Sequence, residues 1–144
     1  MLRIISLSLC LFLILPQMAF TFCFEEAGST YGISPQLLWS IARVESNFNP
    51  HAITWNSNGT YDFGVMQINS SWCPIIGREL WSRLADPCTS VYVGAWVLSQ
   101  CIQRHGYTWE AVGCYNASSK IKRIRYARKI YDVIRKELQT SYRN

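Results

Sequence analysis

Histidine is scarce in this chain of 144 residues, and its six cysteines include no Cys-x-x-Cys pair. The two histidines, His51 and His105, are also far apart in the sequence. Zinc sites are usually built from closely spaced cysteine and histidine ligands. The pattern therefore predicts no metal site, and we expect no cofactor.

The chain also has no internal repeat, no low-complexity tract and no long linker. Its apolar run from Ile4 to Leu15 is shorter than the roughly 20 residues that cross a bilayer. A positive charge at Arg3 precedes the run and small residues at Ala19 and Thr21 follow it, which is typical of a secretory signal peptide. We expect residues 1–21 to be the signal and residues 22–144 to form one exported domain without a stable membrane span.

Negative charge is sparse toward the C-terminus. Nine of the fourteen lysines and arginines lie from Lys120 onward, opposed only by Asp132 and Glu137. Such a segment could meet an anionic wall polymer, a membrane surface or nucleic acid, and a solvated helix face is the simpler interpretation. We expect no nucleic acid partner, because the tyrosines of this segment form no recognised stacking motif.

Strand signals are nearly absent, and helix signals dominate. Ser34-Pro35 and Asp86-Pro87 each place an N-cap residue before a proline at the first helical position. After the first pair an apolar face continues to Glu45, and after the second it continues to a stop near His105-Gly106. Two helices are predicted, and Glu45 falls in the last turns of the first.

Two more helices are predicted near the C-terminus, a short one over 109–117 and a long basic one from residue 120 onward. The stretch from 47 to 61 contains Pro50, Gly59 and four asparagines, so it is predicted to be a loop, with or without a short hairpin. The fold class expected is mainly α, a compact single domain with this irregular loop beside a cleft. The buried stripe of the long helix is expected to comprise Ile121, Ile124, Ala127, Tyr131, Ile134 and Leu138.

Two carboxylates, Glu45 and Asp62, lie seventeen residues apart on either side of this loop. The apolar neighbours of Glu45 in the sequence disfavour its ionised form, which suits a general acid. A protonated carboxyl paired with a solvated carboxylate is the arrangement of a glycan-cleaving site. Taken alone, the helix position of Glu45 favours an exposed surface glutamate, and the neighbouring motifs reverse that interpretation.

A second cluster, Gly64-Val-Met-Gln-Ile-Asn69, is predicted to be an apolar turn of helix. Its glycine allows the backbone to approach another segment or a ligand closely. Core packing explains the apolar members, whereas Gln67 and Asn69 suit hydrogen bonds to sugar amides and hydroxyls.

A third cluster, Ala111-Val-Gly-Cys-Tyr-Asn-Ala117, supplies a tyrosine and an asparagine. Tyr115 is suited to bond Glu45 or a sugar, and Asn116 to hold the following backbone. By itself Tyr115 is better explained as a packed aromatic residue. Its occurrence with the other two clusters favours a role at the same site.

The three clusters carry a family resemblance. Glu45-Ser46, Gly64-Val-Met-Gln67 and Ala111 to Ala117 resemble, in order and spacing, the three motifs of soluble lytic transglycosylases, which have a goose-lysozyme-like fold. The resemblance covers nearly all of residues 22–144. With Asp86-Pro-Cys88 and Tyr107 to Gly113, the chain looks most like the small specialised enzymes of the IagB and IpgF type, which accompany type III and type IV secretion, conjugation and pilus systems.

This resemblance implies cleavage of the β-1,4 bond between N-acetylmuramic acid and N-acetylglucosamine in peptidoglycan. Glu45 would act first as an acid and then as a base toward the sugar's own C6 hydroxyl, which closes a 1,6-anhydro ring. Ser46 and Tyr115 would orient Glu45 and its substrate. Substrate-binding roles would fall to Asp62, Gln67, Asn69 and Asn116.

The segment from Glu45 to Ser70 also resembles the active site of animal C-type lysozymes, in which a glutamate and an aspartate are spaced this way. A hydrolytic muramidase that uses Glu45 and Asp62 is therefore an alternative, as is a noncatalytic wall-binding scaffold. The third cluster and the basic C-terminal helix lie outside the lysozyme pattern, which favours the transglycosylase. Asp62 stays open between a catalytic carboxylate, a substrate-contacting or loop-ordering residue, and a cap of the following helix.

Five cysteines follow the expected signal, in an oxidising compartment where disulfides persist. Cys23 and Cys88 occupy positions that resemble a pair tying the N-terminus to a helix. Cys101 and Cys114 lie across a helical hairpin, so a second bridge is expected there. Cys73 would then be free.

The expected location is the bacterial periplasm, and the expected ligand is a peptidoglycan glycan strand. The enzyme is expected to be a monomer that opens the cell wall locally. Its expected protein partners are components of a type III or type IV secretion, conjugation or pilus apparatus.

Overall fold

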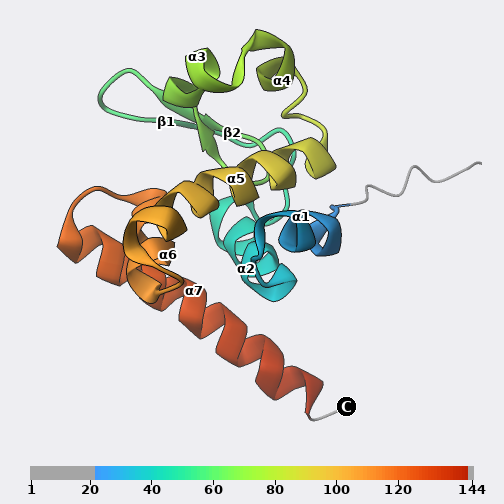
Figure 1. The fold of residues 1–144 in the computed structure, drawn as a ribbon, viewed down its shortest axis with the longest axis vertical. Helices are drawn as coiled ribbons and strands as arrows, with labels where there is room; N and C mark the ends of the chain where they lie inside the picture. The colour runs from blue at the N-terminus through green and yellow to red at the C-terminus, as the bar shows by residue number, and fades with distance from the viewer. Residues whose placement is uncertain (1–21, 143–144) are drawn as a thin grey trace, which may run out of the picture.

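The computed structural model describes residues 22–142, so the expected signal peptide at residues 1–21 lies outside the described part of the chain. Within it, helices surround one long central helix and a small sheet lies to one side (Figure 1). This is the mainly α, lysozyme-like architecture expected from the sequence. The α-helices are α1 (Phe24–Tyr31), α2 (Pro35–Ser46), α3 (Cys73–Ile76), α4 (Arg78–Ser82), α5 (Pro87–His105), α6 (Trp109–Asn116) and α7 (Lys120–Ser141). The strands are β1 (Ile53–Trp55), β2 (Tyr61–Phe63) and β3 (Ile68–Asn69), and a 3-10 turn spans Ser70–Trp72.

Helix α5 forms the centre of the core. Its buried residues include Val91 and Leu98, and α1, α2 and α6 all pack against it. Helix α7 packs instead on α6 and α2 (Figure 1). Helix α5 begins where the sequence predicted it, after Asp86. The Asp86 carboxylate caps the helix by accepting hydrogen bonds from the Thr89 backbone N–H at 2.8 Å and from the Thr89 hydroxyl at 2.7 Å.

Helix α2 ends abruptly just after Glu45. Asn47 and Phe48 both adopt left-handed backbone conformations, with φ of 52° and 64°. Asparagine tolerates this conformation well, whereas a phenylalanine in it costs about 1–2 kcal/mol. The Phe48 ring packs against Trp39, with ring centroids 5.2 Å apart, and against Phe22 at 5.6 Å. This aromatic packing holds the turn that leaves Glu45 at the end of the helix.

The strands form an antiparallel sheet in the order β1-β2-β3, so the loop contains the short hairpin left open by the sequence. In its register Asp62 pairs with Thr54 on one side and with Asn69 on the other. The prediction of a helical turn over 64–69 is wrong. Gly64 has a φ of +79°, which interrupts a helix, and the chain turns through Gln67 into β3.

The expected buried stripe of α7 is also largely wrong. The residues buried on this helix are Tyr126, Ala127 and Ile130. The buried face is therefore turned around the helix axis relative to the expected one, because α6 and α2 contact the side that carries Tyr126 and Ile130. Of the expected stripe, Ala127 is buried and Ile134 is half-buried, whereas the exposed members are Ile121, Ile124, Tyr131 and Leu138.

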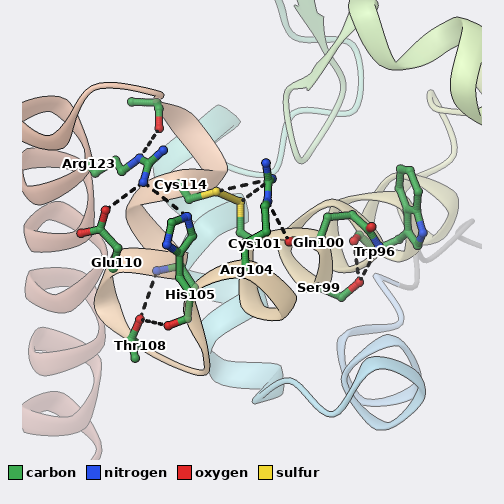
Figure 2. Close-up of a disulfide and its surroundings, with 12 residues drawn as sticks. Trp96, Ser99, Gln100, Cys101, Arg104, His105, Thr108, Glu110, Cys114 and Arg123 are labelled. Atoms are coloured by element: carbon green, nitrogen blue, oxygen red, sulfur yellow. Dashed lines mark hydrogen bonds and ion pairs between the residues drawn. A yellow bond between two sulfur atoms is a disulfide. The ribbon is translucent and has the colours of Figure 1, made fainter.

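Both disulfides join the expected cysteine pairs. Cys23–Cys88 ties the start of α1 to α5, and Cys101–Cys114 joins α5 to α6. Figure 2 shows the second bridge beside an ion pair between Arg123 of α7 and Glu110 of α6, which are 2.8 Å apart. Of the described cysteines, Cys73 is free. Within residues 22–142, none of the helices has the length and apolar character of a membrane span.

Candidate active site

A cleft of about 500 Å³ opens between the hairpin and the junction of α6 with α7. Its walls are mainly polar, and they come from segments that are far apart in the sequence. Glu45 enters from the end of α2, Asp62 from the middle of β2, and Lys122 from the first turn of α7. The other polar residues that line it include Asn56, Asn58, Thr60, Gln67, Asn69, Tyr115, Asn116 and Ser118.

Burial gives Glu45 the character of an acid that holds its proton near neutral pH. Removal of the carboxyl from water raises the pKa of Glu45 from an ordinary 4.5 to about 7. The hydrogen bond from Tyr126 lowers this pKa, the negative charge of Asp62 raises it, and the positive charge of Lys129 lowers it. The protonated and ionised forms are therefore both accessible near pH 7, as acid–base catalysis requires.

Tyr126 of α7 is a site residue that the sequence analysis missed. Its hydroxyl donates a hydrogen bond to Glu45 Oε1. Burial, followed by the nearby Glu45 charge, raises the pKa of Tyr126 well above its ordinary value, so the hydroxyl stays a donor. The spacing of Tyr126, Ile130 and Ile134 marks one helical face, and this pattern is the signal that could have identified it.

Tyr115 and Ser46 do not donate their hydrogen bonds to Glu45. The Tyr115 hydroxyl donates to the Met66 carbonyl at 2.7 Å, and the Ser46 hydroxyl donates to the Val65 carbonyl at 2.8 Å. Both residues thus fasten the turn between β2 and β3 to the helices that border the cleft. Tyr115 also stacks on Tyr126, with ring centroids 6.5 Å apart, and so supports the tyrosine that bonds Glu45.

Asp62 is held by two side-chain amides. Asn69 Nδ2 donates to its Oδ1 at 2.7 Å, and Asn56 Nδ2 donates to its Oδ2 at 3.0 Å. Because Asp62 lies in the middle of β2, it caps no helix, and that interpretation is wrong. The carboxylate instead orders the hairpin and lines the cleft together with Glu45.

The Gln67 side chain is used by the protein itself. Its Nε2 donates to the carbonyls of Ala52 at 3.1 Å and Gly64 at 3.0 Å, and its Oε1 accepts from the Thr54 hydroxyl at 2.7 Å. These bonds stabilise the turn in which Gln67 has a φ of 48°. Gln67 therefore lines the cleft as a structural brace.

Asn69 and Asn116 differ in how much of their hydrogen-bonding capacity is free. Asn69 Oδ1 accepts from the Ser71 N–H at 3.0 Å while its Nδ2 holds Asp62. Among the described residues, Asn116 has no side-chain hydrogen bond, and it lies exposed on the cleft wall at the end of α6. Asn116 thus keeps both its donor and its acceptor groups for a ligand. No group of three or more potential metal ligands is found in residues 22–142.

Known proteins are similar to this chain in sequence or in fold. The family model described as Transglycosylase SLT domain matches residues 22–134. The chain is 43% identical over 121 residues to the Invasion protein IagB of Salmonella typhimurium strain LT2, a match that covers 79% of this chain and 76% of that protein. It is 36% identical over 136 residues to Protein IpgF of Shigella flexneri, with 90% and 88% covered. Among solved structures, an inactive variant of the lytic transglycosylase Slt from Pseudomonas aeruginosa has the same fold, with a TM-score of 0.63 at 19% identity over 81% of this chain and 23% of that one.

Proposed function

This chain belongs to the transglycosylase SLT domain family, in its small IagB and IpgF type, and from that membership we propose that it is a peptidoglycan lytic transglycosylase. The substrate bond is the β-1,4 link between N-acetylmuramic acid and N-acetylglucosamine. The product carries a 1,6-anhydromuramic acid end. The observation that carries the proposal is a buried carboxyl, Glu45, whose pKa is raised to about 7 at the wall of a polar cleft.

In this mechanism Glu45 first donates its proton to the glycosidic oxygen as the bond to the anomeric carbon breaks. The resulting carboxylate then takes the proton of the C6 hydroxyl of the muramic acid, and that oxygen closes the ring on the anomeric carbon. The nucleophile belongs to the substrate, so its effective concentration is high and no bound water is needed. One carboxyl serves both steps because its pKa lies near the working pH.

The surrounding groups have separate parts in this proposal. The Tyr126 hydroxyl fixes the orientation of the Glu45 carboxyl and stabilises its ionised form. Asn116 and Lys122, on the opposite side of the cleft from the hairpin, contact the glycan strand. Ser46 and Tyr115 position the site through the turn that carries Met66.

A hydrolytic muramidase is the second candidate, and one observation favours it. Asp62 lines the same cleft as Glu45 and lies close enough for its charge to raise the pKa of Glu45. In that reaction Asp62 would be the nucleophile or would stabilise the positive charge, and water would complete the cleavage.

Digestion of purified peptidoglycan distinguishes the two reactions. Mass spectrometry of the released muropeptides should find anhydromuramic ends, one water lighter than reducing ends and resistant to borohydride. If borohydride reduces the ends of all the products, the enzyme is a muramidase and not a transglycosylase. The Glu45→Gln variant should release neither product, whereas Glu25→Gln, an exposed change in α1, should act as the wild type does. Continued cleavage by Glu45→Gln would remove Glu45 from the mechanism.

The cellular setting is part of the same proposal. Residues 1–21 direct export, and the domain from residue 22 onward works as a monomer in the bacterial periplasm, opening the wall for a secretion, conjugation or pilus apparatus. Two disulfides suit an oxidising compartment, and one relative is named an invasion protein. Cell fractionation with detection of the shortened chain tests the export. Intact protein found only in the cytoplasm would refute it.

A further inference from the structure

An apolar stripe runs along the outer side of α7. Ile124, Tyr131 and Leu138 recur every seven residues and are 52%, 48% and 42% exposed. Trp109 of α6, itself 48% exposed, packs edge-on against Tyr131 with ring centroids 5.6 Å apart. A hollow of about 410 Å³ lies between these two helices. We call these four residues the α7 stripe.

The fold does not need the α7 stripe. The inward side of the helix is occupied by Tyr126 and Ile130, which pack on the rest of the domain. From residue 135 to 142 every side chain is exposed, and the last turns of α7 extend away from the other helices (Figure 1). A helix that is apolar on both its inner and its outer side has a second apolar surface, which marks an interaction site.

Positive charges outnumber negative ones around the α7 stripe, and Glu110, which lines the hollow, is paired with Arg123. Arg128 and Arg135 lie on the same side of the helix as the stripe, since they follow Ile124 and Tyr131 by four residues each. Of the cations on α7, Arg123 is paired with Glu110 at 2.8 Å, whereas Arg135 makes a longer contact of 3.8 Å with Asp132. Within residues 22–142 the others have no acidic partner: Lys120, Lys122, Arg125, Arg128, Lys129 and Lys136.

We propose that the α7 stripe and its arginines dock this protein on an anionic phospholipid membrane. Aromatic and aliphatic side chains of the stripe enter the headgroup region, and Arg128 and Arg135 contact lipid phosphates. Tryptophan and tyrosine are suited to that region because each has an apolar body and a polar tip. Binding at this surface does not depend on the glycan-cleaving activity.

The charges favour a membrane over a second copy of the chain. Two copies packed through their stripes would bring Arg128 and Arg135 of both molecules together, and like charges at such distances oppose association. A wall polymer would satisfy the cations but would leave Trp109, Tyr131 and Leu138 in water. An anionic bilayer satisfies both the charged and the apolar groups.

This docking leaves the cleft open to the cell wall. Lys122, which lines the cleft, precedes Tyr131 by nine residues, and at 3.6 residues per turn the two lie about 180° apart around α7. With Tyr131 against the lipid, the cleft faces away from the bilayer. A glycan strand would then reach Glu45 without displacing the enzyme from the membrane.

Vesicle flotation tests the proposal. The exported protein, purified from the periplasm and with its N-terminus established by mass spectrometry, is mixed with vesicles of phosphatidylglycerol and phosphatidylethanolamine or of phosphatidylcholine alone. It should float with the anionic vesicles and stay behind with the neutral ones. Raising salt from about 0.1 M to about 1 M shortens the screening length from about 10 Å to about 3 Å, so it should weaken binding. Absence of binding to anionic vesicles overturns the proposal, as does equal binding to neutral ones.

Variants separate this docking from general attraction of a basic protein. Replacement of Ile124, Tyr131 and Leu138 by serine keeps every cation and should weaken binding to anionic vesicles at least about tenfold. Arg128→Gln with Arg135→Gln should weaken it roughly 25-fold, about fivefold for each cation removed. Circular dichroism and peptidoglycan cleavage of the serine triple variant should match the wild type, because its residues are exposed and outside the cleft.

The matched controls remove as many apolar or charged groups elsewhere. Serine at Ile53, Trp55 and Ile75, which are 54%, 72% and 64% exposed, should leave vesicle binding unchanged, as should Arg78→Gln with Arg83→Gln. A serine triple variant of α7 that binds as well as the wild type overturns the proposal. So does a loss of binding shared equally by the control variants, or a stable dimer in light scattering that the α7 variant abolishes.

Discussion

Replacing Tyr126 with phenylalanine removes the hydroxyl that donates to Glu45 Oε1 and keeps the buried ring. That hydrogen bond stabilises the ionised carboxylate and lowers the pKa of Glu45. A hydrogen bond to a charged group contributes about 1.5–3 kcal/mol, and one pKa unit corresponds to about 1.4 kcal/mol. The pKa of Glu45 in Tyr126→Phe should therefore lie about one to two units above its wild-type value of about 7.

Asp62→Asn should act in the opposite direction. The negative charge of Asp62 raises the pKa of Glu45, so a neutral amide there should lower this pKa. The shift should be smaller than that of Tyr126→Phe, less than about one unit, because a charge across a solvated cleft acts through a high effective dielectric. Two variants of residues on different elements thus move the same titration in opposite directions.

The assay is the pH dependence of kcat/KM for release of muropeptides from purified peptidoglycan, over about pH 4 to 9. Activity needs protonated Glu45, so the rate should fall as pH rises through the pKa of that carboxyl in the free enzyme. The alkaline limb should move up in pH for Tyr126→Phe and down for Asp62→Asn. Tyr131→Phe, on the exposed side of the same helix, should leave the limb in place.

The position of the limb is the readout, because either variant is free to change the maximal rate for other reasons. A limb that both variants leave unmoved would show that the titrating group is not Glu45. A downward shift in Tyr126→Phe would mean that the tyrosine stabilises the protonated acid, contrary to the direction argued from its hydrogen bond.

Three further outcomes follow from the same contacts. The pKa of Glu45 is about 7 in the folded state against an ordinary 4.5, so the wild type should lose about 3 kcal/mol of unfolding free energy as pH rises from about 4.5 to about 7. Glu45→Gln does not titrate, so it should melt at a higher temperature than the wild type at about pH 8 and at the same temperature at about pH 4. Gly94→Ala places a Cβ within 2.8 Å of Met66 side-chain carbons and should lower unfolding free energy by about 1–3 kcal/mol in urea titration. Cys101→Ser with Cys114→Ser opens a loop with a sequence separation of 13 and should cost about 2–3 kcal/mol in the same titration.

Local chemistry explains which elements the sequence predicted well. The starts of α2 and α5 were predicted correctly because a proline at the first helical position is a local signal. Asp86 also caps α5 with its side chain, whereas Ser34 makes no side-chain cap hydrogen bond at the start of α2. The turn over 64–67 was not predicted because its apolar residues suit a helix. Its cause is a close approach to another segment, since a Cβ at Gly64 would lie 2.9 Å from the Leu84 carbonyl oxygen. Close approach between distant segments leaves no local pattern.

The face of α7 shows the same limit at the site itself. Helical periodicity reveals two apolar faces on this helix, one with Ile124 and Tyr131 and one with Tyr126 and Ile130. The face with Ile124 and Tyr131 was expected to be buried, but the face with Tyr126 and Ile130 is the buried one. Only packing against α2 and α6 decides between them, and that decision also brings Tyr126 to Glu45. The sequence motif therefore points to Glu45, whereas the periodicity of α7 offers two apolar faces and does not decide which of them supplies the hydrogen-bond donor.

The polar side chains of the cleft divide into those that build it and those left for a ligand. Gln67 and Asn69 suited sugar recognition by residue type, yet the Gln67 amide holds the turn, and the Asn69 amide holds the Asp62 carboxylate together with that of Asn56. Since Asp62 raises the pKa of Glu45, the amides of Asn56 and Asn69 influence that pKa through the placement of the Asp62 charge. Loss of the Asn69 amide should therefore alter the alkaline limb of the pH profile, whereas loss of Asn116 should raise KM without moving it. The two kinds of polar residue are separable by kinetics even though they share one cleft.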